Sequence, residues 1–193
     1  MMSARALGRV LAVLAAAILV AVLVAGLHSA TRNMALPLTD AAIIRQQAAA
    51  KRLDPALVAG VIYAESKFDP RPSSAGAQGL MQILPETAYY LARLSGGSAF
   101  RVNDLATPSV NVAYGSYYLR YLLDHYKGNE TLALAAYNGG LANVDRWSAR
   151  ASAEGRALGV AGIPFPETRE YVQRVLSAQR AYRATYPAEL GLR

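Results

Sequence analysis

An unbroken apolar run near the N-terminus is the first clear pattern along the chain. Residues 10–27 contain only Val, Leu, Ile, Ala and one Gly. As a helix this run is ~27 Å long, close to the hydrocarbon thickness of a bilayer. Arg5 and Arg9 precede it and favour an N-terminus that stays in the cytoplasm. The pattern predicts a membrane anchor within residues 1–30. A signal peptide that is cleaved is the alternative, although its cleavage motif is poor.

The rest of the chain, residues 31–193, reads as a series of short helices separated by Gly and Pro. Asp54-Pro55 and Thr107-Pro108 each join a capping residue to a Pro at the first helical position. No stretch keeps a two-residue alternation, so we expect no large sheet and an all-α globular domain. Start and stop signals predict helices at about 40–52, 55–67, 85–94, 108–126, 129–138 and 166–182, loops at 71–79 and 155–166, and a short turn at 142–147.

Composition narrows the chemistry. The chain has no Cys and only His28 and His125, which excludes disulfides, thiolate zinc sites and a cysteine nucleophile. No metal or organic cofactor is implied. Residues 1–35 hold three of the 20 basic groups and none of the 13 acids, so the remainder keeps 17 against 13, a net +4. This mild excess suits an anionic polymer or a membrane surface, whereas a nucleic-acid binder has a dense basic patch.

The candidate chemistry centres on Glu65. Val58, Val61 and Glu65 are spaced three or four apart, so the acid shares the apolar stripe of the predicted helix. Burial without a cation raises the pKa of a carboxyl and keeps it protonated at neutral pH, which a general acid requires. The alternative is an ordinary rim glutamate paired with Lys67 or an arginine.

Two further segments carry small or hydrogen-bonding residues. Residues 73–82 form a Gly-rich loop that ends in Met81-Gln82, and small residues let a backbone approach a ligand closely. The loop lacks the Lys-Ser/Thr ending of a nucleotide-binding P-loop. Tyr137 and Asn138 place a hydroxyl and an amide at a helix end. Taken alone, Tyr137 is equally well explained as a core aromatic and Asn138 as a helix C-cap.

Together these segments resemble the catalytic domain of soluble lytic transglycosylases (the SLT domain), peptidoglycan-cleaving enzymes similar to goose-type lysozyme. The resemblance spans about residues 54–176. It rests on Glu65-Ser66-Lys67-Phe68-Asp69-Pro70, Gly76-Ala77-Gln78-Gly79-Leu80-Met81-Gln82, Ala136-Tyr137-Asn138-Gly139-Gly140 and Pro166-Glu167-Thr168-Arg169.

The resemblance implies a lysozyme-like, mainly α-helical fold over residues 31–193, with a cleft for a glycan strand. It implies that Glu65 is the sole catalytic acid/base, cleaving after N-acetylmuramic acid to leave a 1,6-anhydro end. It also implies peptidoglycan as the partner. Together with the apolar segment at residues 10–27 and the arginines before it, this predicts a periplasmic domain tethered to the inner membrane, and the mild charge excess predicts no nucleic-acid partner. The residues carried over as substrate-binding are Ser66, Met81, Gln82, Tyr137, Asn138 and Glu167.

The other carboxylates of the chain offer no clear second catalytic acid beside Glu65. Glycosidases normally use two carboxylates, yet Asp69 before a Pro and Glu86 in a helix first turn have ordinary structural explanations. Glu167 after Pro166 is equally a helix-start acid. We expect Lys67 and Arg71 to point away from Glu65.

Two functions are alternatives to a lytic transglycosylase: a lysozyme-type hydrolase of the same bond, and a catalytically silent peptidoglycan-binding module of a wall-spanning assembly. The oligomeric state is not predicted.

Overall fold

The computed structural model describes residue 18 and residues 20–22, 36–96 and 99–192. Residues 1–37 and 38–193 form two separate compact units. Of the predicted anchor at 10–27, only residues 18 and 20–22 are described, and they are helical and exposed. The rest of that segment lies outside the described residues, so the anchor stays a prediction. No helix among the described residues is both long and apolar enough to cross a membrane.

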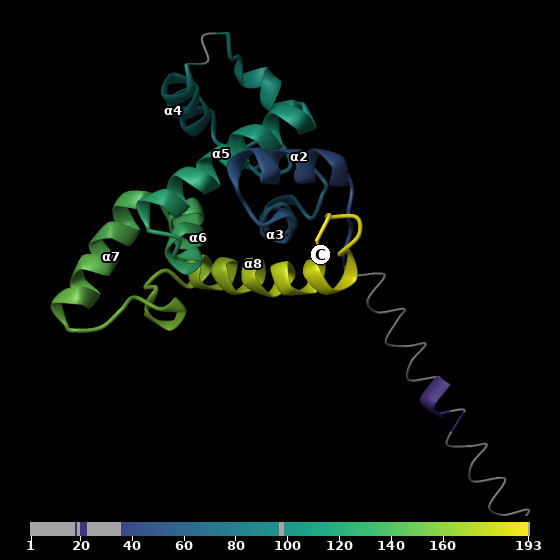
Figure 1. Cartoon of the computed structure of the whole chain (residues 1–193). Coiled ribbons are helices and arrows are strands. Elements are labelled where there is room, and N and C mark those ends of the chain that lie inside the picture. The colour runs from purple at the N-terminus through teal and green to yellow at the C-terminus, as the bar shows by residue number, and fades with distance from the viewer. Residues whose placement is uncertain (1–17, 19, 23–35, 97–98, 193) are drawn as a thin grey trace, which may run out of the picture. The chain divides into compact units, whose positions relative to one another are not determined.

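The second unit is helical throughout, as the sequence predicts (Figure 1). Within the described residues, the one β-type pairing is an isolated bridge between Gln78 and Ile83. The elements are α2 (Ala41–Lys51), α3 (Pro55–Ser66), α4 (Pro85–Ser95), the 3-10 helix η1 (Val102–Ala106), α5 (Pro108–His125), α6 (Glu130–Gly139), α7 (Leu141–Ala153), the 3-10 helix η2 (Val160–Gly162) and α8 (Pro166–Thr185).

The predicted start signals act as expected at two helices. Asp54 Oδ1 accepts a 2.9 Å hydrogen bond from the Ala56 N–H at the start of α3. Asn129 Oδ1 accepts one of 3.1 Å from the Leu132 N–H at the start of α6. These contacts satisfy N–H groups that have no partner within the helix. The local sequence therefore determines where both helices begin.

The short turn predicted at 142–147 is wrong. Residues Leu141–Ala153 form the helix α7, which begins directly after α6 ends. Gly140 has φ 86° and ψ 137°, a conformation that redirects the chain within one residue. The following segment is rich in Ala and Arg, which favour helix. The glycine pair therefore ends one helix and allows another to start at once.

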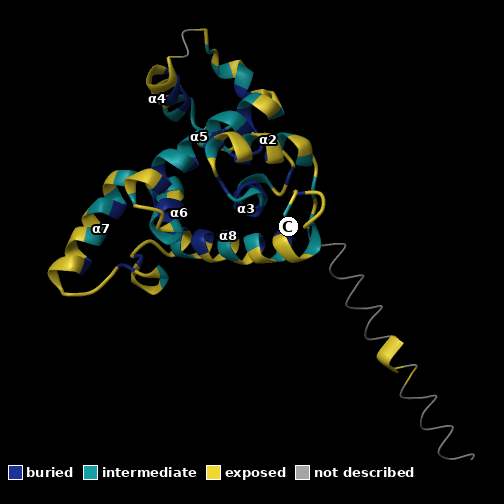
Figure 2. Ribbon diagram, in the orientation of Figure 1, coloured by how far each residue is buried: buried dark blue, intermediate teal, exposed yellow. Residues whose placement is uncertain are grey.

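Helix α3 occupies the centre of the unit. Every residue from Ala56 to Ile62 is buried, so this stretch is enclosed on all sides rather than along one stripe. In Figure 1 it is seen end-on between α2 and α8, and its most extensive packing is against α8. Figure 2 shows the same helix as a dark, buried element within a largely exposed outer surface.

The contact between α3 and α8 depends on Gly60. A Cβ added there would lie 3.0 Å from the Val175 carbonyl oxygen and 3.1 Å from the Gln179 backbone nitrogen. Both neighbours are backbone atoms of α8, so they move only if the helix moves. The absence of a side chain at Gly60 is what allows this close approach.

We predict that Gly60→Ala lowers the free energy of unfolding by about 1–3 kcal/mol, because α8 must shift to admit the methyl group. Gly159→Ala is the matched control, since a Cβ at Gly159 meets nothing within 4 Å. Urea unfolding followed by circular dichroism measures both variants of the full-length chain. Equal stability of the two variants would contradict the role of this contact.

Candidate active site

Glu65 lies near the C-terminal end of α3, one residue before its last residue, Ser66. Burial raises the pKa of the Glu65 carboxyl to about 7, against the lowering effects of the Tyr171 hydroxyl and the Arg174 guanidinium. The apolar stripe predicted from the sequence is part of a helix that is buried all round. Near neutral pH the carboxyl is therefore divided between its protonated and ionised forms, as a group that both donates and accepts a proton requires.

Two residues of α8 next to Glu65 were missed by the sequence analysis as site residues. The Tyr171 side chain is buried, and its hydroxyl is directed at the Glu65 carboxyl, whose ionised form it favours as a hydrogen-bond donor. Burial, and then the charge of Glu65, raise the pKa of Tyr171 well above its ordinary value. Arg174 is the cation that acts on Glu65. Tyr171 lies two residues beyond the Pro166-Glu167-Thr168-Arg169 motif, but nothing in its spacing indicates that α8 packs against the end of α3.

The cations that flank Glu65 in the sequence do not influence it. The Arg71 side chain is 82% exposed and pairs with Asp69 at 2.5 Å. Lys67 is exposed and caps the end of α3. The expectation that both point outward is confirmed.

The Gly-rich loop is held by Asn111 of α5. Its side-chain oxygen accepts from the Met81 N–H at 2.8 Å, and its nitrogen donates to the carbonyls of Gln78 at 2.8 Å and Leu105 at 3.1 Å. A Cβ at Gly79 would lie 2.0 Å from the Asn111 amide nitrogen, and Gly79 has φ +76°. Both facts explain the glycine at this position.

Ser66 of α3 and the loop residue Met81 both connect the loop to the helices around it. Ser66 Oγ donates to the Leu80 carbonyl at 2.8 Å, which ties the end of α3 to the loop. The Met81 side chain is fully buried, and a Cβ at Gly115 would lie 2.4 Å from its sulfur. The structure therefore places Met81 in the core and not in the wall of a cleft. Its contribution is a carbonyl that accepts the Tyr137 hydroxyl at 2.9 Å.

Gln82 stands at the open edge of the loop in a left-handed conformation, with φ 47°. Its amide nitrogen donates to the carbonyls of Gly79 at 2.8 Å and Arg71 at 2.9 Å. A non-glycine residue in this region is strained, and such strain collects at functional sites. The two donated bonds fix the amide, so its oxygen is the atom left to accept from other groups.

Tyr137 and Asn138 end α6 beside the first turn of α8. Burial, and then the charge of Glu65, raise the pKa of Tyr137 well above its usual value. Asn138 Oδ1 accepts from Thr168 Oγ1 at 2.8 Å. A Cβ at Gly139 would lie 2.9 Å from that same Thr168 oxygen, so the glycine lets α8 approach.

A pocket brings several of the predicted residues together. Gln82, Tyr137 and Asn138 line it, with Leu84, Thr87 and Tyr118 among the others. Glu65 is linked to this pocket through Tyr137, a lining residue whose pKa is raised by the charge of Glu65. Ser66, Met81 and Glu167 are not among the residues that line it, and Glu167 is an exposed residue in the first turn of α8, next to Thr168. The arrangement sets one titratable carboxyl beside hydroxyl and amide groups, as proton transfer to a polar substrate requires.

We predict that Asn111→Ala lowers the free energy of unfolding by about 3 kcal/mol, because buried backbone groups lose their partners. Asn143→Ala is the control. Asn143 is partly exposed and donates one bond, to Gly139, so a loss of about 1 kcal/mol or less is expected. The two variants are compared by urea unfolding. An Asn111 variant no less stable than the control would be inconsistent with the clamp.

We also predict a pH-dependent gain in stability for Glu65→Gln. The raised pKa means that wild type loses stability as the pH rises from about 4.5 to about 7, where the unfolded carboxyl ionises before the native one. Above pH 7 the variant should be more stable by about 2–3 kcal/mol, and near pH 4 the two should match. Thermal unfolding at both pH values measures this, and a difference that does not change with pH would contradict burial as its cause.

Comparison with known proteins identifies the family. The family described as "Transglycosylase SLT domain" matches residues 42–158, a stretch that includes Glu65, Gln82 and Tyr137 and ends before α8. The soluble lytic murein transglycosylase of Escherichia coli is 31% identical over 150 residues, covering 76% of this chain and 23% of that protein. The membrane-bound lytic murein transglycosylase C of Histophilus somni is 29% identical over 178 residues, covering 78% and 47%.

The fold agrees with a solved structure. The lytic transglycosylase Slt of Pseudomonas aeruginosa, solved as an inactive glutamate-to-glutamine mutant, matches with a TM-score of 0.72 and 33% identity. The match covers 79% of this chain and 25% of that one. This chain thus spans about a quarter of the length of these soluble relatives. Because the family match and the shared fold both cover most of the helical unit, the chain belongs to the Transglycosylase SLT domain family.

Proposed function

We propose that this chain is a peptidoglycan lytic transglycosylase that cleaves the β-1,4 bond after N-acetylmuramic acid and uses Glu65 as its only acid/base. The single observation that carries the proposal is the pKa of Glu65, which burial raises to about 7 beside a pocket lined by hydroxyl and amide groups. The two relatives described above are both named lytic murein transglycosylases, which agrees with this substrate.

In the first step the Glu65 carboxyl donates its proton to the glycosidic oxygen. The bond between that oxygen and C1 of the muramic ring breaks, the leaving sugar takes the proton, and positive charge develops at C1. Fixed dipoles that accept or donate without reorganising stabilise such a charge distribution. The Gln82 amide and the Tyr137 hydroxyl, both held in place by the loop, are the groups for this role.

In the second step the Glu65 carboxylate accepts a proton from the C6 hydroxyl of the same ring. The C6 oxygen forms a bond to C1, which closes the 1,6-anhydro ring and returns Glu65 to its protonated form. No water enters, so the products together have the composition of the substrate. One group performs both transfers because its pKa lies close to the working pH.

The other site residues tune the ionisation of Glu65, position the loop or contact the glycan strand. Tyr171 and Arg174 favour the ionised form of Glu65, which keeps its pKa from rising further. Ser66 positions the loop through its bond to the Leu80 carbonyl, and Met81, within the loop, positions the Tyr137 hydroxyl through its carbonyl. Asn138 and Glu167, at the meeting of α6 and α8, are the groups we assign to the outer part of the glycan strand.

The proposal includes the place of action. Residues 31–193 carry the catalytic domain on the periplasmic side, and the apolar residues 10–27 tether it to the inner membrane. Support comes from the apolar length of that segment and from the arginines before it. A signal peptide that is removed remains the alternative, and fractionation of membranes with detection of the full-length chain separates the two.

We predict that full-length wild type releases muropeptides with 1,6-anhydro ends from purified peptidoglycan, and that Glu65→Gln releases about a thousandth as much or less. Mass spectrometry of the released products measures both the amount and the end. Glu189→Gln is the matched control because this exposed acid lies in the C-terminal turn, and it should leave release unchanged.

Any other result of this experiment would contradict part of the proposal. Reducing-end products, heavier by one water, would make the protein a hydrolase with a positioned water. No release by folded wild type would favour a silent peptidoglycan-binding module. Full activity in Glu65→Gln would remove Glu65 from the mechanism.

A further inference from the structure

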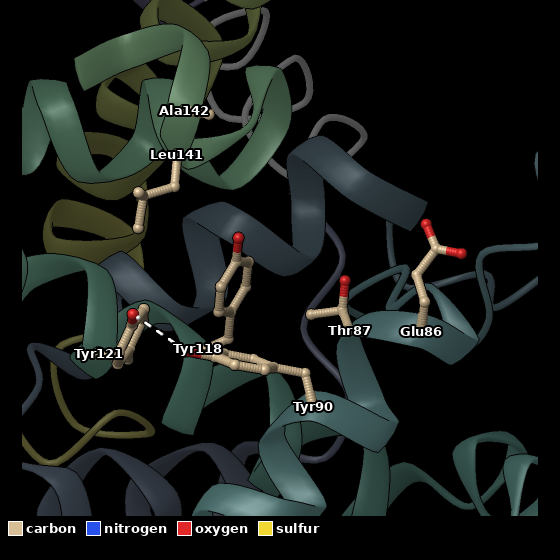
Figure 3. Close-up of a pocket in the computed structure, with 7 residues that line it drawn as sticks. All are labelled: Glu86, Thr87, Tyr90, Tyr118, Tyr121, Leu141 and Ala142. Atoms are coloured by element: carbon tan, nitrogen blue, oxygen red, sulfur yellow. Dashed lines mark hydrogen bonds between the residues drawn. The ribbon is translucent and has the colours of Figure 1, made fainter. Parts of the chain in front are cut away.

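Helix α4 contributes side chains to two pockets with different linings. The larger, of about 400 Å³, is shown in Figure 3, where the hydroxyls of Tyr90 and Tyr121 lie 3.2 Å apart. It shares Thr87 and Tyr118 with the pocket to which Glu65 is linked, so it belongs to the site described above. The smaller, of about 180 Å³, shares no lining residue with either of them, and its side chains take no part in the catalytic steps.

Three helices build this smaller pocket, which we call the Lys51 pocket. Lys51 is the last residue of α2, and α4 and α5 supply the other lining side chains. These are Leu91 and Ser95 of α4, and Ala113, Tyr114 and Tyr117 of α5. Because the three helices come from separate parts of the sequence, the pocket forms only when the domain folds.

The one charged group in this lining is the Lys51 ammonium. Its nitrogen donates to Gln47 Oε1 of the same helix at 2.6 Å, and among the described residues it forms no ion pair. Lys51 is partly buried, and burial lowers the pKa of its ammonium. A cation that has lost water without gaining an anion is stabilised by a ligand that brings one negative charge.

The rest of the lining combines hydrogen-bond donors with apolar surface. The Tyr114 phenol stays protonated, and so remains a donor, because burial and then the charge of Asp104 raise its pKa. Asp104 itself is outside the lining and accepts from the Arg101 N–H at 2.8 Å. Leu91 and Ala113 supply aliphatic carbon. The lining therefore matches an anion that carries an apolar group.

Charge and volume narrow the ligand further. One ammonium balances the single charge of a carboxylate, whereas a phosphate dianion would keep an uncompensated charge in a partly buried site. A cavity of about 180 Å³ is smaller than the ~300–1,000 Å³ usual for drug-sized ligands. The ligand is therefore a small acid, comparable to one amino acid in size.

We propose that the Lys51 pocket binds a small carboxylate, whose charged group pairs with Lys51 and whose apolar group lies between α4 and α5. A free acid and the C-terminal residue of a peptide both present this chemistry. The pocket is separate from the one linked to Glu65, so binding here does not depend on cleavage of a glycan. Because a bound acid contacts the folded domain only, it also stabilises that domain.

The test measures binding to the full-length chain by calorimetry. N-acetyl-L-leucine is the probe, and N-acetyl-L-leucinamide is its uncharged analogue. We expect the acid to bind at least about tenfold more tightly than the amide, and to raise the melting temperature of the domain. Lys51→Met keeps an apolar side chain but removes the charge, so it should weaken binding of the acid about tenfold. Ala113→Leu should fill the pocket and give a similar loss, with circular dichroism to check that it folds.

Lys127→Met is the matched control, because Lys127 is exposed and lies outside the lining. It should bind the acid as wild type does. The peptide acetyl-Ala-Ala-Leu distinguishes the two sources: binding as tight as that of N-acetyl-L-leucine supports a peptide C-terminus, and weaker binding supports a free acid.

Failure of wild type to bind the acid, or equal binding of the acid and the amide, would overturn the proposal. Unchanged binding of the acid in Lys51→Met would do the same. Because none of these measurements needs turnover, their results are distinct from a failure of wild type to cleave peptidoglycan.

Discussion

Helix α3 is enclosed on every side from Ala56 to Ile62, and its approach to α8 at Gly60 decides the environment of Glu65. A carboxyl attached to such a helix loses contact with water as the helix is buried, and the loss of hydration opposes ionisation. The same packing brings Tyr171 and Arg174 of α8 to the carboxyl and limits the effect. The acidity of the site is thus a consequence of how two helices pack, and the stability of the fold and the chemistry of Glu65 are linked.

The loop after α3 depends on a different constraint, the pairing of backbone groups away from water. The Asn111 side chain forms hydrogen bonds with three such groups. Ser66 donates to the Leu80 carbonyl, and Tyr137 donates to the Met81 carbonyl. Unpaired, each would destabilise the folded state, so the contacts act together to hold one loop conformation. That conformation keeps Gln82 in the left-handed region at the edge of the pocket. The loop is therefore held rigidly, because losing any of these hydrogen bonds would leave a backbone group without a partner.

The site is assembled from helix ends. Glu65 lies in the last turn of α3 and Asn138 in the last turn of α6, while Thr87 and Thr168 lie in the first turns of α4 and α8. Gly79 and Gly115 carry no side chain where the loop meets α5, and Gly139 carries none where the end of α6 meets α8, so these segments come within contact distance. An arrangement of this kind lets separate short elements contribute one or two polar groups each to a shared pocket, while the apolar parts of the same helices form the core.

The sequence by itself determined where most helices begin, because Asp54, Asn129 and the prolines at 55, 85, 108 and 166 act within one turn of their own position. It also determined the family, since the motifs around Glu65, Gln82 and Tyr137 are contiguous. The sequence analysis predicted a short turn after Gly139-Gly140, where a second helix in fact begins. It also predicted that Met81 binds substrate, although its side chain is buried in the core. Only the tertiary structure decided that Tyr171 and Arg174 adjoin Glu65, that Asn111 holds the loop and that Tyr90 meets Tyr121. These contacts join residues far apart in the chain, and desolvation arises from all elements around a group at once, so neither can be inferred from local spacing.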